Sequence, residues 1–279
     1  MTLKGHSGIV YAIAILNNGD LISGSMDNTV KIWNMIDGTV KQTLNIHTGY
    51  LQRDIIILDN NKLINASSNF AINIWSLNDG SLRKTLSGHS SDIRALVLLK
   101  NGDLASGSTN HAIKIWNIED GSLKRTLNGH TNAIWSLVVL KNGDLVSGSS
   151  DTTIKIWDVE SGAIKRILTG HTSHVYALIV LENGDLVSGS QDKAIKIWNA
   201  ESGTVKMTLT GHTGYVFALK VLPNGDLVSG CSGGKIKIWD VKKGSVRNEI
   251  QVNSKINSFQ VLENGDLVSA SDESIIIWE

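Results

Sequence analysis

The chain has 279 residues with 26 basic and 26 acidic side chains, so its formal net charge is zero. That balance argues against a protein that binds nucleic acid or an anionic membrane, because both need a basic surface. No apolar run is long enough to cross a membrane as a helix, and the first residues do not resemble a signal peptide. The single cysteine, Cys231, excludes an internal disulfide and a cysteine-based metal site. We therefore expect a cytoplasmic protein without metal or cofactor.

Glycine and tryptophan are unusually frequent and proline is nearly absent, with 27 glycines, eight tryptophans and one proline. Such a skew is typical of a short segment copied many times. Tryptophan recurs every 39 to 42 residues, at positions 33, 75, 116, 157, 198, 239 and 278. The sequence predicts a single domain over 1–279 built from seven repeats, which span 2–42, 43–84, 85–125, 126–166, 167–207, 208–248 and 249–279.

Each repeat contains four short segments typical of β-strands, which the fourth repeat shows most clearly. In chain order they span 134–140, 145–149, 154–157 and 163–168, and Asn142-Gly143 forms a hairpin turn after the first. No segment has a helical period. Seven such units predict an all-β, seven-bladed β-propeller in which each blade is a four-stranded antiparallel sheet.

The last repeat ends one residue after Trp278, so we expect the outer strand of the last blade to be short or missing. Two explanations remain open: the residues before Gly5 supply a very short closing strand, or the chain was cut from a longer protein. We expect a monomer unless an open edge of this blade pairs with another chain.

Three motifs recur in register: Gly-His, Ser-Gly-Ser-x-Asp, and Ile-Lys-Ile-Trp followed by Asp or Asn. With them the chain resembles the WD-repeat β-propeller family over all seven repeats. The resemblance implies a non-catalytic scaffold for protein interactions. It also implies a buried hydrogen-bond chain in each blade, from the turn aspartate through histidine and serine to the tryptophan indole.

Three repeats carry all four members of this chain. They are His6, Ser23, Asp27 and Trp33 in the first repeat, His130, Ser147, Asp151 and Trp157 in the fourth, and His171, Ser188, Asp192 and Trp198 in the fifth. A hydrolytic Ser-His-Asp triad would need a single asymmetric site with an exposed nucleophile, so several identical copies favour a structural role and argue against an enzyme.

The other repeats depart from this pattern. Asn110 replaces the aspartate in the third repeat, and Gly233 replaces it in the sixth. Asn65 and Asn69 replace serine and aspartate in the second, and the seventh lacks Gly-His although Ser269, Asp272 and Trp278 remain.

Variation between the copies points to a possible binding surface. Six of the eight other aromatic residues lie three or five positions after the repeat histidine, where the innermost strand of each blade begins. These strand starts meet at one rim of the central channel, which the resemblance implies is the partner-binding face, together with the residue before the turn aspartate. We call the following residues the rim set: Ile9, Tyr11, Met26, Tyr50, Asp92, Arg94, Thr109, Trp135, His174, Tyr176, Gln191, Tyr215, Phe217 and Lys255. Asn257 and Ser150 stand at the same positions in other repeats.

The expected ligand of the rim set is a peptide or a loop of a protein, because aromatic and arginine side chains dominate binding hot spots. The alternative is that some of the rings only pack between blades. Two other functions remain open: a regulatory or sensory propeller domain of a larger signalling enzyme, and a near-idealised repeat array without an evolved partner. The basic pairs at 83–84, 124–125 and 165–166 are predicted to form a solvated outer surface.

The incomplete hydrogen-bond chains predict that blades two, six and seven are the least rigid. In an amide hydrogen-exchange experiment, their strands should exchange before those of blade four, because an unpaired buried polar group destabilises the blade that contains it. Earlier opening of blade four than of these blades would contradict this expectation.

Overall fold

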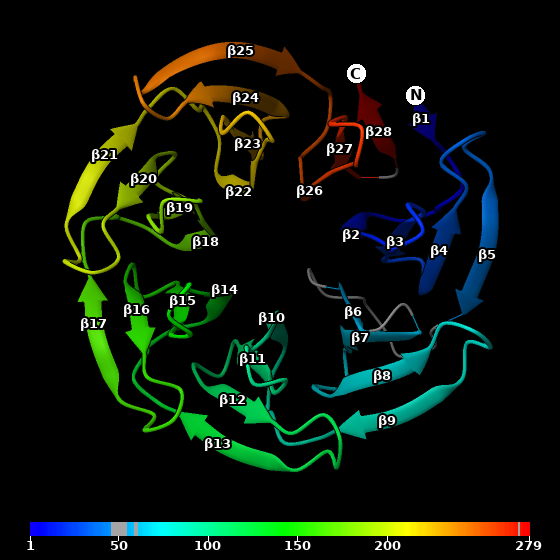
Figure 1. Ribbon diagram of the computed structural model, residues 1–279, viewed down its shortest axis with the longest axis horizontal. Helices are drawn as coiled ribbons and strands as arrows, with labels where there is room; N and C mark the ends of the chain where they lie inside the picture. The colour runs from blue at the N-terminus through cyan, green and yellow to red at the C-terminus, as the bar shows by residue number, and fades with distance from the viewer. Residues whose placement is uncertain (46–54, 59–60, 273) are drawn as a thin grey trace.

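The computed structural model describes residues 1–45, 55–58, 61–272 and 274–279, and the regular structure of this part of the chain is entirely β-strand. The strands form seven four-stranded antiparallel sheets arranged in a ring (Figure 1). This confirms the all-β, seven-bladed propeller predicted from the repeats. No helix in the described residues could span a membrane.

The four strands of a blade follow one another from the centre of the ring to its outer edge. The innermost strands are β2 (Val10–Ile15), β6 (Ile55–Leu58), β10 (Ile93–Leu98), β14 (Ile134–Val139), β18 (Val175–Val180), β22 (Val216–Val221) and β26 (Ser258–Val261). The second strands are β3 (Leu21–Ser25), β7 (Lys62–Ala66), β11 (Leu104–Ser108), β15 (Leu145–Ser149), β19 (Leu186–Ser190), β23 (Leu227–Cys231) and β27 (Leu267–Ala270).

The third strands are β4 (Thr29–Trp33), β8 (Ile72–Ser76), β12 (Ile113–Trp116), β16 (Ile154–Trp157), β20 (Ile195–Trp198), β24 (Lys235–Asp240) and β28 (Ile275–Trp278). The outer strands are β5 (Val40–Asn45), β9 (Leu82–Leu86), β13 (Leu123–Leu127), β17 (Ile164–Leu168), β21 (Val205–Leu209), β25 (Ser245–Gln251) and β1 (Thr2–Leu3). Blades one to six are therefore consecutive in the chain, from β2–β5 to β22–β25. Blade seven combines β26, β27 and β28 with β1.

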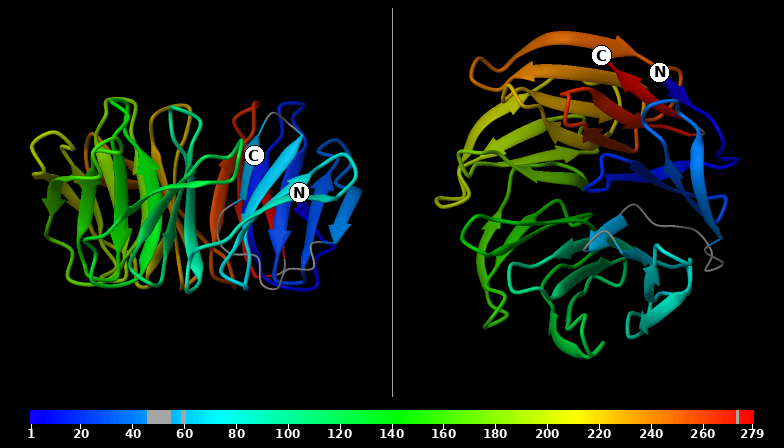
Figure 2. Two further views of the ribbon diagram at one scale, coloured as in Figure 1. Left: turned by 90° about the horizontal axis from the view of Figure 1, so that it is seen from below. Right: turned by 45° about the vertical axis from the view of Figure 1, so that its right-hand side comes forward.

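The ring is closed by the two ends of the chain. The short outer strand predicted for the last blade is β1, which pairs antiparallel with β28 through Thr2 opposite Ile276 and Leu3 opposite Ile275. The Met1 amino group donates to the Ile277 carbonyl at 3.0 Å, and the Ile277 amide donates to the Met1 carbonyl at 2.8 Å. The N- and C-termini therefore lie side by side in Figures 1 and 2.

The turns gather on two opposite faces of the ring, as the side view in Figure 2 shows. One face carries the Asn-Gly-Asp hairpins between the first and second strands. There Gly143 adopts a φ of 94°, and Asp144 is held by its neighbour, since its amide donates to Asn142 Oδ1 at 3.0 Å. The other face carries the turns between the second and third strands, and we call it the rim face because the innermost strands of blades one to six begin there.

Adjacent blades pack through a glycine in the second strand of one blade and a branched residue in the innermost strand of the next. A Cβ atom at Gly107 would lie 2.5 Å from Ile134 Cγ2, and a Cβ atom at Gly148 would lie 2.8 Å from Val175 Cγ1. Gly189 and Gly230 meet Val216 and Ile256 in the same way. Because no side chain fits between these strands, the glycine sets the distance between neighbouring blades.

Replacing Gly148 by alanine should therefore destabilise the fold by about 1–3 kcal/mol, the usual cost of overpacking a close-packed interior. Chemical denaturation measures this change through the midpoint of unfolding. The matched control is Gly233→Ala, where the new Cβ would meet nothing closer than Thr213 Oγ1 at 3.6 Å. Equal effects of the two substitutions would show that this blade contact does not limit stability.

Candidate functional site

The repeated polar residues form a linear hydrogen-bond chain inside the blades. In blade four, His130 Nδ1 lies 2.7 Å from Asp151 Oδ2, and its Nε2 lies 2.7 Å from Ser147 Oγ. The Trp157 indole donates to the same Ser147 Oγ at 2.8 Å. Every atom is satisfied when Nδ1 carries the ring proton and donates to Asp151, while the Ser147 hydroxyl donates to Nε2.

Blades one and five repeat this geometry. His6 contacts Asp27 at 2.8 Å and Ser23 at 2.7 Å, and His171 contacts Asp192 and Ser188, each at 2.7 Å. The three serines, Ser23, Ser147 and Ser188, are fully buried and each also accepts a tryptophan indole N–H. A nucleophile must reach its substrate, so these buried serines are structural groups.

The environment keeps the turn aspartates ionised. Burial would raise the pKa of Asp192, but the hydrogen bond and charge of His171, with the backbone amides of Ala194 and Thr172, lower that pKa to about 2. Burial acts in the opposite direction on His6 and lowers its pKa, even though Asp27 partly opposes the shift. The carboxylate thus anchors the chain on the rim face.

The incomplete repeats keep part of this chain. In blade two the Asn65 side-chain oxygen accepts the Trp75 indole N–H at 2.7 Å, so asparagine replaces serine as acceptor. In blade seven the Trp278 indole donates to Ser269 at 2.9 Å. His47, which would complete the chain of blade two, lies outside the described residues.

Among the described residues, Nδ1 of His89 in blade three and Nδ1 of His212 in blade six are buried without a hydrogen bond. At the repeat position of the aspartate, blade six has Gly233 and blade three has Asn110, whose amide nitrogen donates to Ser90. Burial, reinforced by the nearby lysine charges of Lys114 and Lys237, lowers the pKa of both histidines to about 4.

The rim face carries a continuous row of aromatic rings at the mouth of the channel. Trp135 in β14 packs edge-to-face on Tyr176 in β18, with ring centroids 5.2 Å apart. Tyr176 then packs on Phe217 in β22 at 4.6 Å, and Tyr215 lies 6.3 Å from Phe217. We call Trp135, Tyr176 and Phe217 the aromatic ladder, since they occupy the same position in blades four, five and six.

The exposed fraction of each ring indicates whether it can bind a partner or only packs between blades. Tyr176 is 9% exposed and fills the space between its neighbours, as the packing alternative expects. Trp135 and Phe217 are half-buried, and Tyr215 is 39% exposed at the surface. His174 joins the group through its ring, 5.8 Å from Tyr176.

A cation lies at each end of the aromatic ladder. The Arg94 guanidinium of blade three lies 5.3 Å from the Trp135 ring centroid and 2.6 Å from Asp92 Oδ2. The Lys255 ammonium of blade seven lies 3.9 Å from the Phe217 centroid. A continuous series of contacts therefore runs from blade three to blade seven. Its members are Asp92, Arg94, Trp135, Tyr176, Phe217 and Lys255.

Several further members of the rim set bond to groups of their own blade. The Tyr11 hydroxyl lies 3.8 Å from Met26 Sδ, and Ser150, which follows Ser149 in blade four, accepts the Trp135 indole N–H at 2.5 Å. Thr109 and Gln191 bond to the serines of the preceding turns, Ser91 and Ser173, each at 2.7 Å, and Ile9 accepts the Met26 amide through its carbonyl. Tyr50 lies outside the described residues.

Phe70 is a surface aromatic that the predicted rim set does not include. It lies in the turn between β7 and β8 on the rim face, is 38% exposed, and adopts a φ of 63° that bulky residues rarely take. The signal was available, because Phe70 and Phe259 are the two aromatics that neither the repeat tryptophan nor the rim positions explain.

The basic pairs lie on the exposed outer strands, as predicted, and they also bond to neighbouring groups. In blades three and four the first residue of a pair binds the Asn-Gly-Asp aspartate of its own blade, Lys124 with Asp103 at 2.8 Å and Lys165 with Asp144 at 2.7 Å, whereas Arg83 of blade two binds Asp79 at 3.1 Å. The second reaches the next blade, where Arg166 donates to the Ser202 carbonyl at 3.1 Å. The reason is geometric: the outer strand lies against both its own hairpin and the neighbouring turn.

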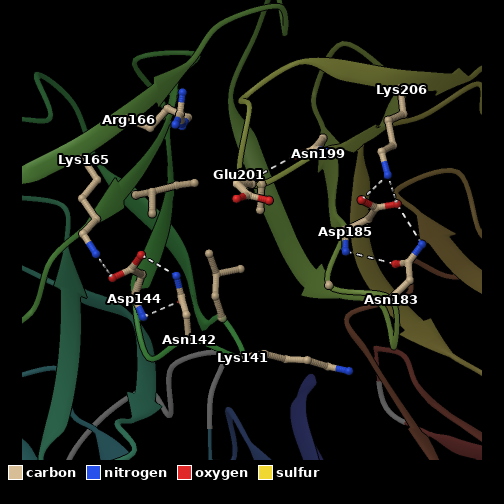
Figure 3. A pocket seen from close by; sticks show the side chains of 14 residues that line it. Lys141, Asn142, Asp144, Lys165, Arg166, Asn183, Asp185, Asn199, Glu201 and Lys206 are labelled. Carbon is tan, nitrogen blue, oxygen red and sulfur yellow. Dashed lines mark hydrogen bonds and ion pairs between the residues drawn. The ribbon is translucent and has the colours of Figure 1, made fainter.

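A cavity of about 510 Å³ lies between blades four and five on the face opposite the rim (Figure 3). Lys165 and Lys206 line it, but each is paired with an aspartate, Asp144 and Asp185 respectively. The same pair recurs in blades one, three and six as Lys41 with Asp20, Lys124 with Asp103, and Arg247 with Asp226. Because the repeat itself creates this lining, we assign it to the scaffold. Over the residues that the structure covers, no cluster of three His, Cys, Asp or Glu side chains could hold a metal ion.

The family model described as "WD domain, G-beta repeat" matches residues 1–34, 80–117, 121–158, 162–199 and 203–240. The chain belongs to the WD40 repeat family. The crystal structure of the WD40 β-propeller domain of Doa1 is similar at 28% identity with a TM-score of 0.89, over 100% of this chain and 95% of that one. No curated protein sequence matches the chain at a significant level.

The family model passes over most of the second repeat and all of the seventh. These are the WD40 repeats in which Asn65 and Asn69 replace the usual residues and in which Gly-His is absent. The strands of both blades are nevertheless formed, because the pattern of buried apolar residues persists where the polar motif has changed.

Gly233→Asp should complete the hydrogen-bond chain of blade six and stabilise the protein by about 1 kcal/mol or more, since His212 Nδ1 gains a charged acceptor. Gly233→Ser is the control, because it removes the glycine without supplying a carboxylate. Thermal unfolding at neutral pH compares the two.

The Gly233→Asp substitution should also change how the stability of the protein depends on pH. Histidines with a folded pKa of about 4 bind fewer protons than in the unfolded chain, so stability is complete above pH 6.5 and falls as the pH drops toward 4. Each such histidine contributes about 1.4 kcal/mol per pH unit inside that window. Gly233→Asp should reduce this slope, because the new carboxylate raises the pKa of His212. An unchanged slope would mean that His212 does not titrate with unfolding.

Proposed function

We propose that this WD40 propeller is a non-catalytic scaffold that binds a peptide or a protein loop at the rim set. WD40 propellers are typical protein-interaction platforms. The observation that supports a binding role for this particular rim is the aromatic ladder, because it is built from residues that the repeat does not require.

The chemistry of the rim supports a protein ligand. Trp135, Phe217 and Tyr215 expose part of their rings beside polar groups, so they can bury apolar area and still bond to a partner. Trp135 and Phe217 stand at the starts of β14 and β22, each beside a fully buried residue, Ile134 or Val216, so little conformational freedom is lost when a partner binds.

The non-catalytic part of the proposal follows from the buried hydrogen-bond chains. The serine, histidine and aspartate side chains that could form a triad are occupied by one another and by the tryptophan indole. The buried Cys231 supports a cytoplasmic location, where a free thiol stays reduced.

A triple variant of Tyr11, Trp135 and Tyr215 to alanine should lose at least tenfold in affinity for whatever partner the native chain retains from a lysate of its source cells. Tyr215 is exposed and Tyr11 and Trp135 are half-buried, so their removal costs less folding free energy than removal of the buried Tyr176, which is left intact. Quantitative mass spectrometry of captured proteins measures the loss.

The matched control replaces Ile167 and Val246 by alanine, since both are exposed on outer strands away from the rim. Circular dichroism establishes that all three proteins are folded. Capture of the same proteins by the rim variant and by the control would place the binding surface elsewhere on the propeller.

A further inference from the structure

We propose that the rim set selects an acidic segment, in which Asp or Glu side chains flank an apolar or aromatic residue. This inference rests on the proposed function and adds the chemical class of the partner. The inference is based on two cations, Arg94 and Lys255, which lie over the two outer rings of the aromatic ladder.

Exposed aromatic rings at a channel mouth can bind a cationic side chain of a partner. Here two cations of the protein itself already lie over these rings. Arg94 lies over Trp135 and Lys255 lies over Phe217, both within the roughly 6 Å at which a ring face attracts a cation. Tyr176 closes the middle of the ladder, 5.2 Å from Trp135 and 4.6 Å from Phe217. A lysine or arginine of a partner would meet two like charges beside these rings.

The charge of the rim favours an acidic ligand. The rim set contains Arg94 and Lys255 against Asp92, a formal charge of +1 in a chain whose total is zero. Asp92 is held by Arg94 at 2.6 Å. Three turn aspartates of the same face, Asp27, Asp151 and Asp192, are only 8–10% exposed and are each bound to a histidine, and the fourth, Asp272, is half-buried.

The two cations are held in place before a ligand arrives. The Arg94 side chain is 28% exposed and is fixed by Asp92 and Trp135, and Lys255 is half-buried against Phe217. A carboxylate that approaches either one therefore orders few new side-chain torsions. Apolar side chains between the two carboxylates then lie over the exposed edges of Trp135, Phe217 and Tyr215.

A cavity of about 130 Å³ adjoins the aromatic ladder. Its lining includes the aromatic ladder and Asn257, which is 6% exposed. The Asn257 amide nitrogen donates to the Val10 carbonyl at 3.1 Å, whereas its Oδ1 is buried without a partner among the described residues. Because this oxygen has almost no accessible surface, it belongs to the protein interior, and the selectivity for an acidic segment rests on Arg94 and Lys255.

The test is a selection of random linear peptides, displayed on phage, against the intact chain. We expect the enriched sequences to place Asp or Glu on both sides of an aromatic or aliphatic residue. Fluorescence anisotropy then compares the consensus peptide with a copy in which lysine replaces each acidic residue. The lysine copy should bind at least tenfold more weakly, and the affinity of the acidic peptide should fall as salt is added.

Charge reversal at the rim sharpens the test. Lys255→Glu should weaken the acidic peptide about tenfold and strengthen the lysine copy, while Lys255→Gln should give an intermediate affinity. Lys243→Glu is the matched control, because it makes the same charge change in the exposed turn between β24 and β25 on the opposite face. Thermal unfolding shows that each variant is folded.

Enrichment of lysine- and arginine-rich or uncharged peptides that still need Trp135 would overturn the acidic class while leaving the proposed function intact. Equal effects of Lys255→Glu and Lys243→Glu would also overturn it. If no peptide is enriched, or if the enriched peptides bind the Trp135→Ala variant equally well, both the acidic class and the proposed binding at the rim are wrong.

Discussion

The close contact between a glycine of one blade and a branched side chain of the next determines the geometry of the whole ring. Gly107, Gly148 and Gly189 leave room for Ile134, Val175 and Val216, and no side chain fits between them. The residue that follows each branched side chain is a member of the aromatic ladder. The contact that spaces the blades therefore also brings Trp135, Tyr176 and Phe217 within stacking distance of one another.

Two sets of polar contacts stabilise the ring: the buried hydrogen-bond chains inside the blades and the ion pairs of the hairpin aspartates. They differ in how many blades contain the complete set. The chain from aspartate to tryptophan is complete in blades one, four and five, and each departure leaves a specific change, such as the unbonded His212 nitrogen beside Gly233. On the opposite face, a lysine in four blades and Arg247 in a fifth bind the hairpin aspartate and hold the outer strand to its hairpin. Stability is thus distributed over many small, repeated contacts, which leaves the rim free to vary.

The rim shows how a repeat scaffold acquires an asymmetric surface. Positions that are equivalent in the repeat hold Arg94, then three aromatic rings, and the row ends at Lys255. Cations at both ends change the preference of the rings, because the attraction for a positive charge is already satisfied within the protein. What remains available is a set of half-exposed ring edges beside fixed positive charge.

The period of 41 residues and the four strand patterns were enough to predict seven blades and their four-stranded sheets, whereas they left open whether the first residues close the ring. The fourth blade shows how closely, since its strands at 145–149 and 154–157 match β15 and β16. Local patterns decide these features because hairpin turns and alternating burial depend on near neighbours. The sequence also indicated that the rim aromatics share one face. The packing of the blades, which no local pattern predicts, buries Tyr176 and leaves Tyr215 exposed. It also places Arg94 and Lys255 over the outer rings. The tertiary structure also decided that Arg166 bonds to the neighbouring blade. These are contacts between different blades, some 40 residues apart in the chain, so they depend on the spacing and tilt of the blades and not on any local pattern.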